Sequence, residues 1–256
     1  MLEIIPLPAL KDNYIWLLKN KASNHVAIVD PSEAKPVLEL IESEGLIPIA
    51  LLITHHHWDH VGGITEITEK HDIPVYTPKT ESVAGSTNPV GEADIVFLSE
   101  LDLELSILDV PGHTSGAVAY YTEGMVFSGD TLFTAGCGRM FEGTPPQMHT
   151  SLSKFKSLPD DTLLYCGHEY TVSNLLFAAA VEPENKAIQQ RLIEAKQLRN
   201  KNLPTVPATL EIEKETNPFL RCEQVSVITA ASQHSGKKQN EPHKVFAEIR
   251  HWKDNF

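Results

Sequence analysis

The chain has 256 residues, of which 41% are hydrophobic, so it can bury a sizeable core in one large domain or two unequal ones. Its formal net charge of −13 argues against nucleic acid as a partner, because phosphate binding relies on a broad basic surface. Three cysteines do not make a disulfide framework and suit a reducing compartment. No secretory signal is visible, and the longest apolar run, residues 46–53, is too short to span a bilayer. We therefore expect a cytoplasmic protein without a membrane partner.

Segments of strand and helix character follow one another along the chain. Apolar runs and alternating patterns predict strands at residues 14–18, 25–29, 47–53, 74–76, 95–98, 103–108, 118–121, 125–127 and 162–166. Helical spacing and end signals predict helices between Ser32 and Gly45, from Ile64 to His71, and at 172–180, 185–201 and 243–252. Several of the strands end at a histidine or an aspartate, which suggests that such side chains gather at one edge of the sheets.

The composition changes near residue 170. Residues 1–170 contain 9 Lys and Arg against 24 Asp and Glu, whereas residues 171–256 contain 12 against 10. Strand-like segments also end there, and helix-like segments follow. We predict two domains, 1–170 and 171–256, of which the second is too small and too charged to bury much alone and packs against the first.

Residues 54–63, Thr-His-His-His-Trp-Asp-His-Val-Gly-Gly, concentrate histidines directly after a strand-like run. Buried histidines need a partner for each ring nitrogen, so this density is best explained by a metal ion. In extended chain the side chains of His55 and His57 fall on one side and can bind one ion, while Asp59 and His60 can bind a second. The alternative is a polar surface loop with crowded histidines. We expect His56 and Trp58 to support the loop rather than to bind metal. The strand before the loop and the glycines after it favour a site.

Three further ligand candidates, His113, Asp130 and His168, each follow a strand-like run and lie next to glycine. Singly, each could be a structural residue at a strand end. Together with the histidine loop they suit two ions that share one carboxylate, with nitrogen and oxygen ligands that fit zinc, iron or manganese. The assignment is His55, His57 and His113 to the first ion, Asp59, His60 and His168 to the second, and Asp130 to both. Two ions roughly 3.5–4 Å apart would activate a shared water, so hydrolysis is the chemistry that we expect.

These elements carry a resemblance to a known family. The His-x-His-x-Asp-His pattern with His113, Asp130 and His168 in order resembles the metallo-β-lactamase superfamily. The resemblance narrows to glyoxalase II, the hydroxyacylglutathione hydrolases, on further motifs and covers essentially the whole chain. These motifs are Pro-Gly-His-Thr-Ser-Gly at 111–116, Gly-Asp-Thr-Leu-Phe at 129–133, Ala-Gly-Cys-Gly-Arg at 135–139, Phe-Glu-Gly-Thr at 141–144, Cys-Gly-His-Glu-Tyr-Thr at 166–171 and Asn-Pro-Phe-Leu-Arg at 217–221.

The resemblance implies an α/β fold: a four-layer αββα sandwich with a C-terminal helical domain. It implies a catalytic domain over 1–170 and a substrate-binding domain over 171–256. The implied reaction hydrolyses S-D-lactoylglutathione to glutathione and D-lactate, the second step of methylglyoxal detoxification by the glyoxalases, with two divalent ions, zinc before iron or manganese. We expect Asp59 to accept a proton from the attacking water, and we expect a monomer.

Family contacts to glutathione fall on Arg139, Tyr170, Arg250 and Lys253. Phe141 departs from the family pattern, in which many members carry tyrosine, so one phenolic hydrogen bond to glutathione is lost, worth about 1 kcal/mol; it could equally be a packed wall. Without the resemblance, Arg250 and Lys253 would read as a solvated helix face. Cys166 falls on a strand and is expected to pack as a small hydrophobic residue.

Rival functions on the same scaffold are a lactonase, a nuclease, a β-lactamase and a persulfide dioxygenase. A common zinc β-lactamase would carry cysteine at position 130, a nuclease would need a basic face, and a single-iron dioxygenase would lack the second set of ligands. A binding protein without turnover would lack some ligands, and none are missing from this sequence.

Overall fold

The computed structural model describes residues 2–256, which form two compact units. The first unit contains the chain up to Asp109 together with Thr114–Gly129. The second contains Val110–His113 and Asp130–Phe256. Each unit brings together segments that are separate in sequence.

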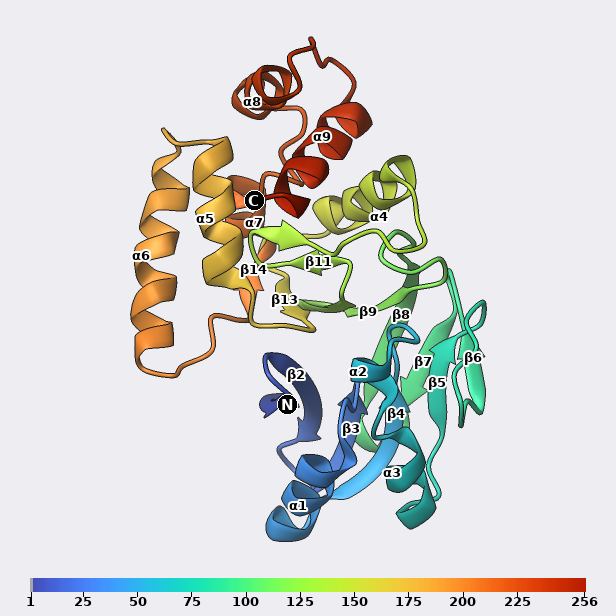
Figure 1. Cartoon of the computed structure of the whole chain (residues 1–256). Helices are drawn as coiled ribbons and strands as arrows, with labels where there is room; N and C mark the ends of the chain where they lie inside the picture. The colour runs from blue at the N-terminus through green and yellow to red at the C-terminus, as the bar shows by residue number, and fades with distance from the viewer. Residues whose placement is uncertain (1) are drawn as a thin grey trace. The chain divides into compact units, whose positions relative to one another are not determined.

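A six-stranded mixed sheet dominates the first unit (Figure 1). Its strands are neighbours in chain order: β1 (Leu2–Ala9), β2 (Asn13–Asn20), β3 (His25–Val29), β4 (Ile47–Leu52), β5 (Val75–Pro78) and β6 (Asn88–Val90). The pairs from β1 to β3 are antiparallel, and those from β3 to β6 are parallel. The central strands β3 and β4 are largely buried and read as almost continuous apolar runs, as parallel strands do.

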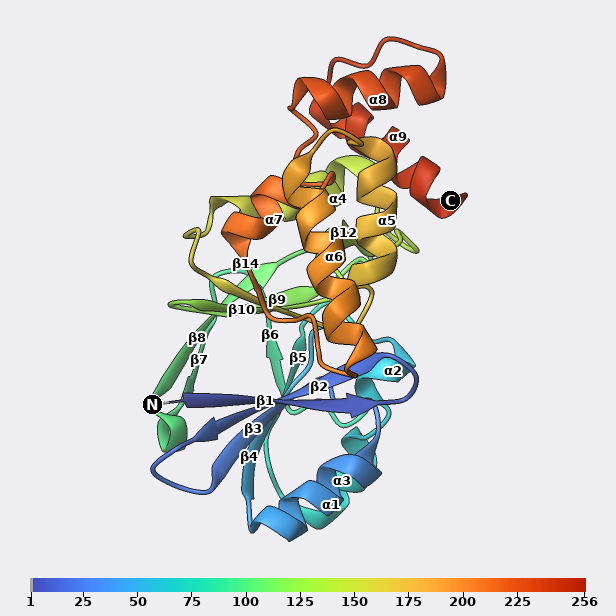
Figure 2. The ribbon, with the colours of Figure 1, turned by 90° about the vertical axis from the view of Figure 1, so that its left-hand side faces the viewer.

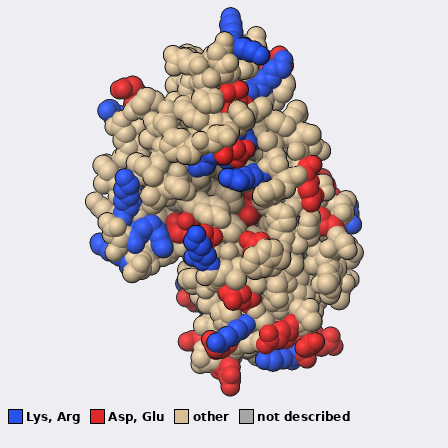
Figure 3. Space-filling view, in the orientation of Figure 1, with Lys and Arg blue, Asp and Glu red and all other residues tan. Residues whose placement is uncertain are grey.

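Helices α1 (Ala34–Glu44) and α3 (Ile64–Lys70) cover one face of this sheet, as Figure 2 also shows. They connect β3 to β4 and β4 to β5, the arrangement that parallel strands require. Val37 and Ile67 of the two helices join Ile28 of the sheet in one buried cluster. The outer faces of the helices carry acidic side chains with interspersed lysines (Figure 3). Exposed ion pairs such as Lys35–Glu39, 3.8 Å apart, contribute little, so burial of the apolar faces holds the helices in place.

A second layer of strands in the first unit is antiparallel. It contains β7 (Ile95–Leu98), β8 (Leu103–Asp109), β9 (Val118–Thr122) and β10 (Met125–Gly129), with the 3-10 turn η1 (Ser99–Leu101) between the first two. The buried Tyr120 hydroxyl donates to the carbonyls of Ile53 and Tyr76, at 3.0 and 3.2 Å, and so ties this layer to the first sheet. Within the first unit the layers are therefore helix, sheet and sheet.

The second unit is mainly helical. Its helices are α4 (Pro145–Ser157), α5 (Thr171–Val181), α6 (Lys186–Asn200), α7 (Leu210–Thr216), α8 (Val225–Ser235) and α9 (Pro242–Asp254). Its strands pair as β11 (Leu132–Phe133) with β12 (Gly136–Cys137) and β13 (Leu163–Cys166) with β14 (Ala208–Thr209). Helices α5 and α6 pack side by side through Leu175, Ala178 and Ile188. Across residues 2–256 no helix combines the length and the apolar character needed to cross a membrane.

The predicted strands and helices are present, but several elements were missed. Strand β1 contains Pro6 and Pro8, which argue against a strand; as an edge strand paired only with β2, it tolerates them. Helix α4 begins with Pro145 and Pro146, which fit the first turn of a helix, and Thr144 and Gln147 form a capping box before it. Helices α7 and α8 and the short strands β6, β11, β12 and β14 were also not predicted.

Candidate metal centre

In the first unit, the histidine loop is anchored by Asp30, which the sequence analysis missed. Asp30 lies just beyond β3 and accepts hydrogen bonds from the Thr54 backbone N–H at 2.8 Å and from the Thr54 hydroxyl at 2.7 Å. Its Oδ2 also lies 3.0 Å from His60 Nδ1. A carboxylate accepts, so His60 carries its proton on Nδ1 and keeps the Nε2 lone pair for a metal.

The imidazoles of the loop converge. The ring centroids of His55 and His57 are 4.8 Å apart, and those of His55 and His60 are 4.1 Å apart. Asp30, His55 and His60 are buried, and each offers one ligand atom within 4.8 Å of the others. The residues that follow β4 thus place several nitrogen donors close together.

Asp59 is oriented by Asn13, the first residue of β2. The Asn13 side-chain amide donates to the Asp59 carbonyl at 3.0 Å and to its Oδ2 at 3.1 Å. The same Oδ2 lies 3.7 Å from His60 Nε2. Asn13 is buried, so the first residue of β2 sets the orientation of the Asp59 carboxylate. Like Asp30, Asn13 is remote in sequence from the residue that it orients.

In the second unit, His113, Asp130 and His168 come together and are all buried. One carboxylate oxygen, Asp130 Oδ2, lies 3.5 Å from His113 Nε2 and 3.2 Å from His168 Nε2. His113 Nδ1 lies 2.7 Å from the Arg139 carbonyl, which can only accept, so the proton is on Nδ1 and the lone pair on Nε2, the tautomer that suits a metal ligand. Gly138 permits this packing, because a Cβ there would lie 2.0 Å from the Asp130 carbonyl oxygen.

Aromatic contacts hold the ring of His168. Tyr170 stacks on it with centroids 4.7 Å apart and an interplanar angle of 3°, and Phe133 meets its edge. Cys166, two residues earlier, points its sulfur toward the His168 carbonyl at 3.5 Å, and burial raises the pKa of its thiol to about 12. The neutral, buried thiol agrees with the prediction that Cys166 packs as a small apolar residue. The donors gathered in each unit are thus imidazole nitrogens and carboxylate oxygens, which fit zinc, iron or manganese.

The residues predicted to contact the substrate all belong to the second unit, and they differ in burial. Arg250 is buried and donates to the Cys137 carbonyl at 2.8 Å and to Asp254 at 3.0 Å, with its guanidinium over Phe219. Arg139 is exposed and lies 3.5 Å from Asp254, so both arginines share one carboxylate.

Lys253 and Phe141 are also predicted to contact the substrate. Lys253 donates to the Ser173 carbonyl at 3.4 Å. Burial, and then the nearby Arg250, lower the pKa of Lys253 to about 8. The Phe141 ring meets the His113 ring at its edge with centroids 5.3 Å apart, and 64% of Phe141 is exposed. The position that departs from the family pattern therefore lies directly beside a predicted metal ligand.

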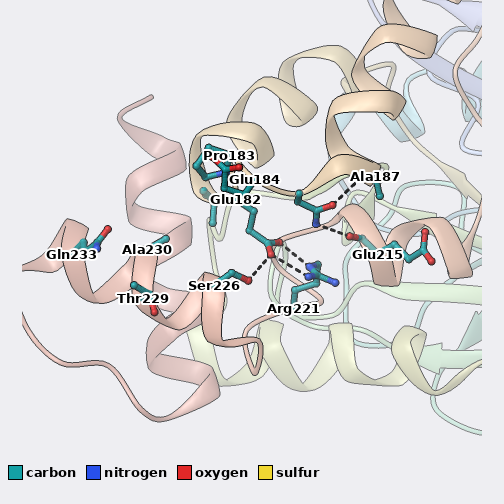
Figure 4. A pocket seen from close by; sticks show the side chains of 12 residues that line it. Glu182, Pro183, Glu184, Ala187, Glu215, Arg221, Ser226, Thr229, Ala230 and Gln233 are labelled. Carbon is teal, nitrogen blue, oxygen red and sulfur yellow. Dashed lines mark hydrogen bonds and ion pairs between the residues drawn. The ribbon is translucent and has the colours of Figure 1, made fainter.

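A large cavity in the second unit, of about 710 Å³, is unrelated to these residues (Figure 4). It is lined by the end of α5, the start of α6 and the first turns of α8. The buried Glu182 accepts two hydrogen bonds from Arg221, at 2.7 and 3.0 Å, and one from the Ser226 hydroxyl at 2.6 Å. The buried charges satisfy one another, so this pair is a structural joint between helices.

Comparison with known proteins shows which families the chain matches. The family described as "Hydroxyacylglutathione hydrolase C-terminus" matches residues 169–256, and the one described as "Metallo-beta-lactamase superfamily" matches residues 11–168. A hydroxyacylglutathione hydrolase of Nitrosomonas eutropha is 48% identical over 256 residues and all of both chains. The chain belongs to the hydroxyacylglutathione hydrolase family. Another member, from Alkalilimnicola ehrlichii, is 50% identical over 254 residues, 99% of both chains.

Solved structures of lower identity share the fold of this chain. ETHE1 from Myxococcus xanthus is 21% identical and covers 99% of this chain and 98% of its own, with a TM-score of 0.65. The BLEG-1 B3 metallo-β-lactamase is 23% identical and covers 86% of this chain and 99% of its own, with a TM-score of 0.63. The predicted family and the predicted α/β class with a metallo-β-lactamase sandwich and C-terminal helices are confirmed.

Proposed function

We propose that the chain hydrolyses the thioester of S-2-hydroxyacylglutathiones, with S-D-lactoylglutathione as the principal substrate, at a centre of two divalent metal ions. The observation that carries the proposal is the single oxygen of Asp130 that faces the Nε2 atoms of His113 and His168. A carboxylate oxygen close to two imidazole nitrogens is typical of a metal site, and the other ring nitrogen of His113 is held by the Arg139 carbonyl, as in a metal-ligating histidine. Membership of the family, over the whole chain, supports the thioester as substrate.

The ligand set that we propose follows the sequence assignment. The first ion would be bound by His55, His57 and His113, the second by Asp59, His60 and His168, and both by Asp130. Support comes from the convergence of these side chains within each unit and from the absence of a thiolate among them. We propose zinc as the resident metal, because it accepts this mixture of imidazole and carboxylate at low coordination number.

The chemistry divides between the ions and the side chains. Bound divalent ions lower the pKa of a water molecule and polarise a carbonyl oxygen. We propose that Asp59, held by Asn13 at 3.0 and 3.1 Å, accepts the proton of the attacking water. The leaving group is a thiol with an ordinary pKa of about 8.5, so it departs as thiolate without a strong general acid. Asp30 and the Arg139 carbonyl keep His60 and His113 in the tautomer that this requires.

For glutathione we propose contacts with Arg139, Tyr170, Lys253 and Arg250, because an anionic tripeptide on an acidic protein needs local cations. Arg139 is exposed and available to a carboxylate. Arg250 has one face committed to Cys137 and Asp254, so its direct contribution would come from the remaining edge of the guanidinium. Phe141 beside His113 would form an apolar wall near the acyl group.

We further propose a catalytic domain over 1–170 and a substrate-binding domain over 171–256, acting as a monomer in the cytoplasm. The change in charge and element type near residue 170 supports the division. The three cysteines are free and buried, which suits a reducing compartment. A mixed-charge surface over α1 and α3 gives no reason to invoke nucleic acid.

The test is thioester hydrolysis measured beside metal content. Purified protein is analysed for zinc, iron and manganese per chain, and loss of the thioester of S-D-lactoylglutathione is followed in the same sample. We expect close to two ions per chain and turnover of this substrate. Two ions without thioesterase activity would overturn the proposal in favour of a lactonase or nuclease. A single iron with persulfide oxidation would favour the dioxygenase.

A further inference from the structure

Glu81, in the connection between β5 and β6, carries a buried carboxylate that is not among the predicted ligands. Only 2% of its side chain is exposed. Its Oε2 accepts a hydrogen bond from the His56 backbone N–H at 2.6 Å and lies 3.0 Å from His56 Nδ1. Its Oε1 accepts from the Gly116 backbone N–H at 3.1 Å and from the Thr114 hydroxyl. All these groups belong to the first unit.

The contact between Glu81 and Gly116 requires glycine at position 116. A Cβ at Gly116 would lie 2.6 Å from Glu81 Cγ and 2.3 Å from the Thr80 hydroxyl oxygen, so glycine is needed for the carboxylate to approach. Both oxygens of the carboxylate are used, and each receives one backbone N–H. A buried charge is tolerated where hydrogen bonds replace its hydration, as they do here.

The contact between Glu81 and the His56 backbone matters because His56 lies between His55 and His57. Successive side chains of extended chain point to opposite sides, so His55 and His57 share the side opposite to His56. The backbone N–H of Thr54 is held by Asp30 at 2.8 Å and that of His56 by Glu81 at 2.6 Å. The loop is thus fixed at two alternate residues by two buried carboxylates, and the residues beside His56 are His55 and His57. The backbone that carries both imidazoles has little freedom to rotate.

Glu81 also ties the histidine loop to the segment that follows His113 in the chain. Thr114 and Gly116 bind one oxygen of Glu81 while His56 binds the other. Two residues further on, Val118 N–H donates to the Thr54 carbonyl at 2.9 Å. Glu81 therefore joins two segments that each border predicted ligands of the first ion.

We propose that Glu81 is a positioning residue that fixes the backbone at His56, and thereby directs the side chains of His55 and His57 toward the first metal ion. The inference rests on the proposed metal centre but not on the identity of the substrate. Loss of an outer partner of this kind typically weakens metal binding by about 10–100-fold.

The test compares Glu81→Gln with two matched controls. Glutamine presents one oxygen and one NH₂ to two backbone N–H donors, so one of those bonds must be lost. His56→Ala removes the imidazole contact but keeps the backbone N–H. Ser86→Ala removes the 2.6 Å Thr77–Ser86 hydrogen bond elsewhere in the same connection. Zinc dissociation constants are measured by competition with a chelator, at a temperature where circular dichroism shows each metal-free protein to be folded.

We expect Glu81→Gln to weaken zinc binding by about 10–100-fold and to lower kcat with little change in KM, while both controls stay within about 3-fold of the wild type. Glu81→Asp, which keeps the charge but reaches less far, should fall between, and it serves if the glutamine variant does not fold. A folded Glu81→Gln protein with wild-type zinc affinity would overturn the inference, as would an equal loss in His56→Ala. If the wild type does not hydrolyse the thioester but Glu81→Gln still weakens zinc binding, the positioning role is supported and the proposed substrate is contradicted.

Discussion

At the scale of single residues, we expect substitution of Asp130 to lower activity and metal content the most. Its Oδ2 faces His113 and His168 at 3.5 and 3.2 Å, so Asp130→Ala removes the carboxylate on which both imidazoles converge. We expect kcat/KM to fall by more than about 100-fold, because a direct ligand should matter more than the outer partners whose loss costs 10–100-fold. Metal content should fall with it, toward one ion per chain.

Asp161→Ala is the matched control for this change, because Asp161 is an exposed aspartate of the same unit. It should retain wild-type turnover and metal content. An Asp130→Ala enzyme that kept both ions and full activity would show that the shared carboxylate has been assigned wrongly.

At the scale of helices, the Glu182–Arg221 pair joins α5 to the segment before α8. Arg221→Met leaves the buried Glu182 carboxylate without its guanidinium, and breaking a buried pair in this way costs about 3–5 kcal/mol. Urea unfolding should show that loss in the free energy of unfolding, while the kcat of the folded enzyme stays unchanged, because the pair lies outside the candidate metal centre.

The exposed pair of Lys35 and Glu39 supplies the comparison. Lys35→Met should change the free energy of unfolding by less than about 1 kcal/mol, because both side chains are largely in solvent. If Arg221→Met cost no more than Lys35→Met, the Glu182–Arg221 pair would not be the structural joint described above.

The buried Glu213 of α7 links that helix to the β11–β12 turn. Its Oε2 accepts from Ala135 N–H at 2.7 Å and from the Asn217 amide at 3.0 Å. Burial raises the pKa of Glu213 from 4.5 to about 7, so the folded state binds this proton more tightly than the unfolded state does. Its contribution to stability is therefore full below about pH 4.5 and declines as the pH rises toward about 7.

Glu213→Gln carries no charge and should remove this dependence. The stability of the variant relative to the wild type should increase by about 3 kcal/mol between pH 4.5 and pH 8, since each pKa unit corresponds to about 1.4 kcal/mol. Unfolding titrations across this range measure the difference. A constant difference at all pH values would mean that Glu213 keeps an ordinary pKa in the folded protein.

The elements that sequence reasoning missed share a physical cause. A continuous apolar run reveals β4 and the helical spacing of apolar residues reveals α6, but β1 can contain two prolines only because it lies at a sheet edge. The same limit applies to the candidate site. Within the histidine loop, residue type marks the candidate ligands a few residues apart. Asn13, Asp30 and Glu81, whose side chains contact the loop, lie 46, 30 and 25 residues away from Asp59, His60 and His56.

At the scale of the whole molecule, removal of the metals is the broadest test. Proposed metal ligands in both units already have protein partners: His60 is held by Asp30 and His113 by the Arg139 carbonyl. We expect chelator-treated protein to keep its circular dichroism spectrum, because these contacts do not depend on an ion. Its Tm should nevertheless fall, since ions that bind only the folded state stabilise it by about 4 kcal/mol at a free concentration 1,000 times the Kd.

Added zinc should restore both the Tm and thioester hydrolysis in the wild type. Asp130→Ala, treated in the same way, should show a smaller rise in Tm, because one ligand of the proposed centre is gone. Equal Tm values for the metal-free and the zinc-loaded wild type would contradict the proposed metal centre. Unfolding on chelation would instead mean that the contacts of Asp30 and of the Arg139 carbonyl are too weak to hold the ligands by themselves.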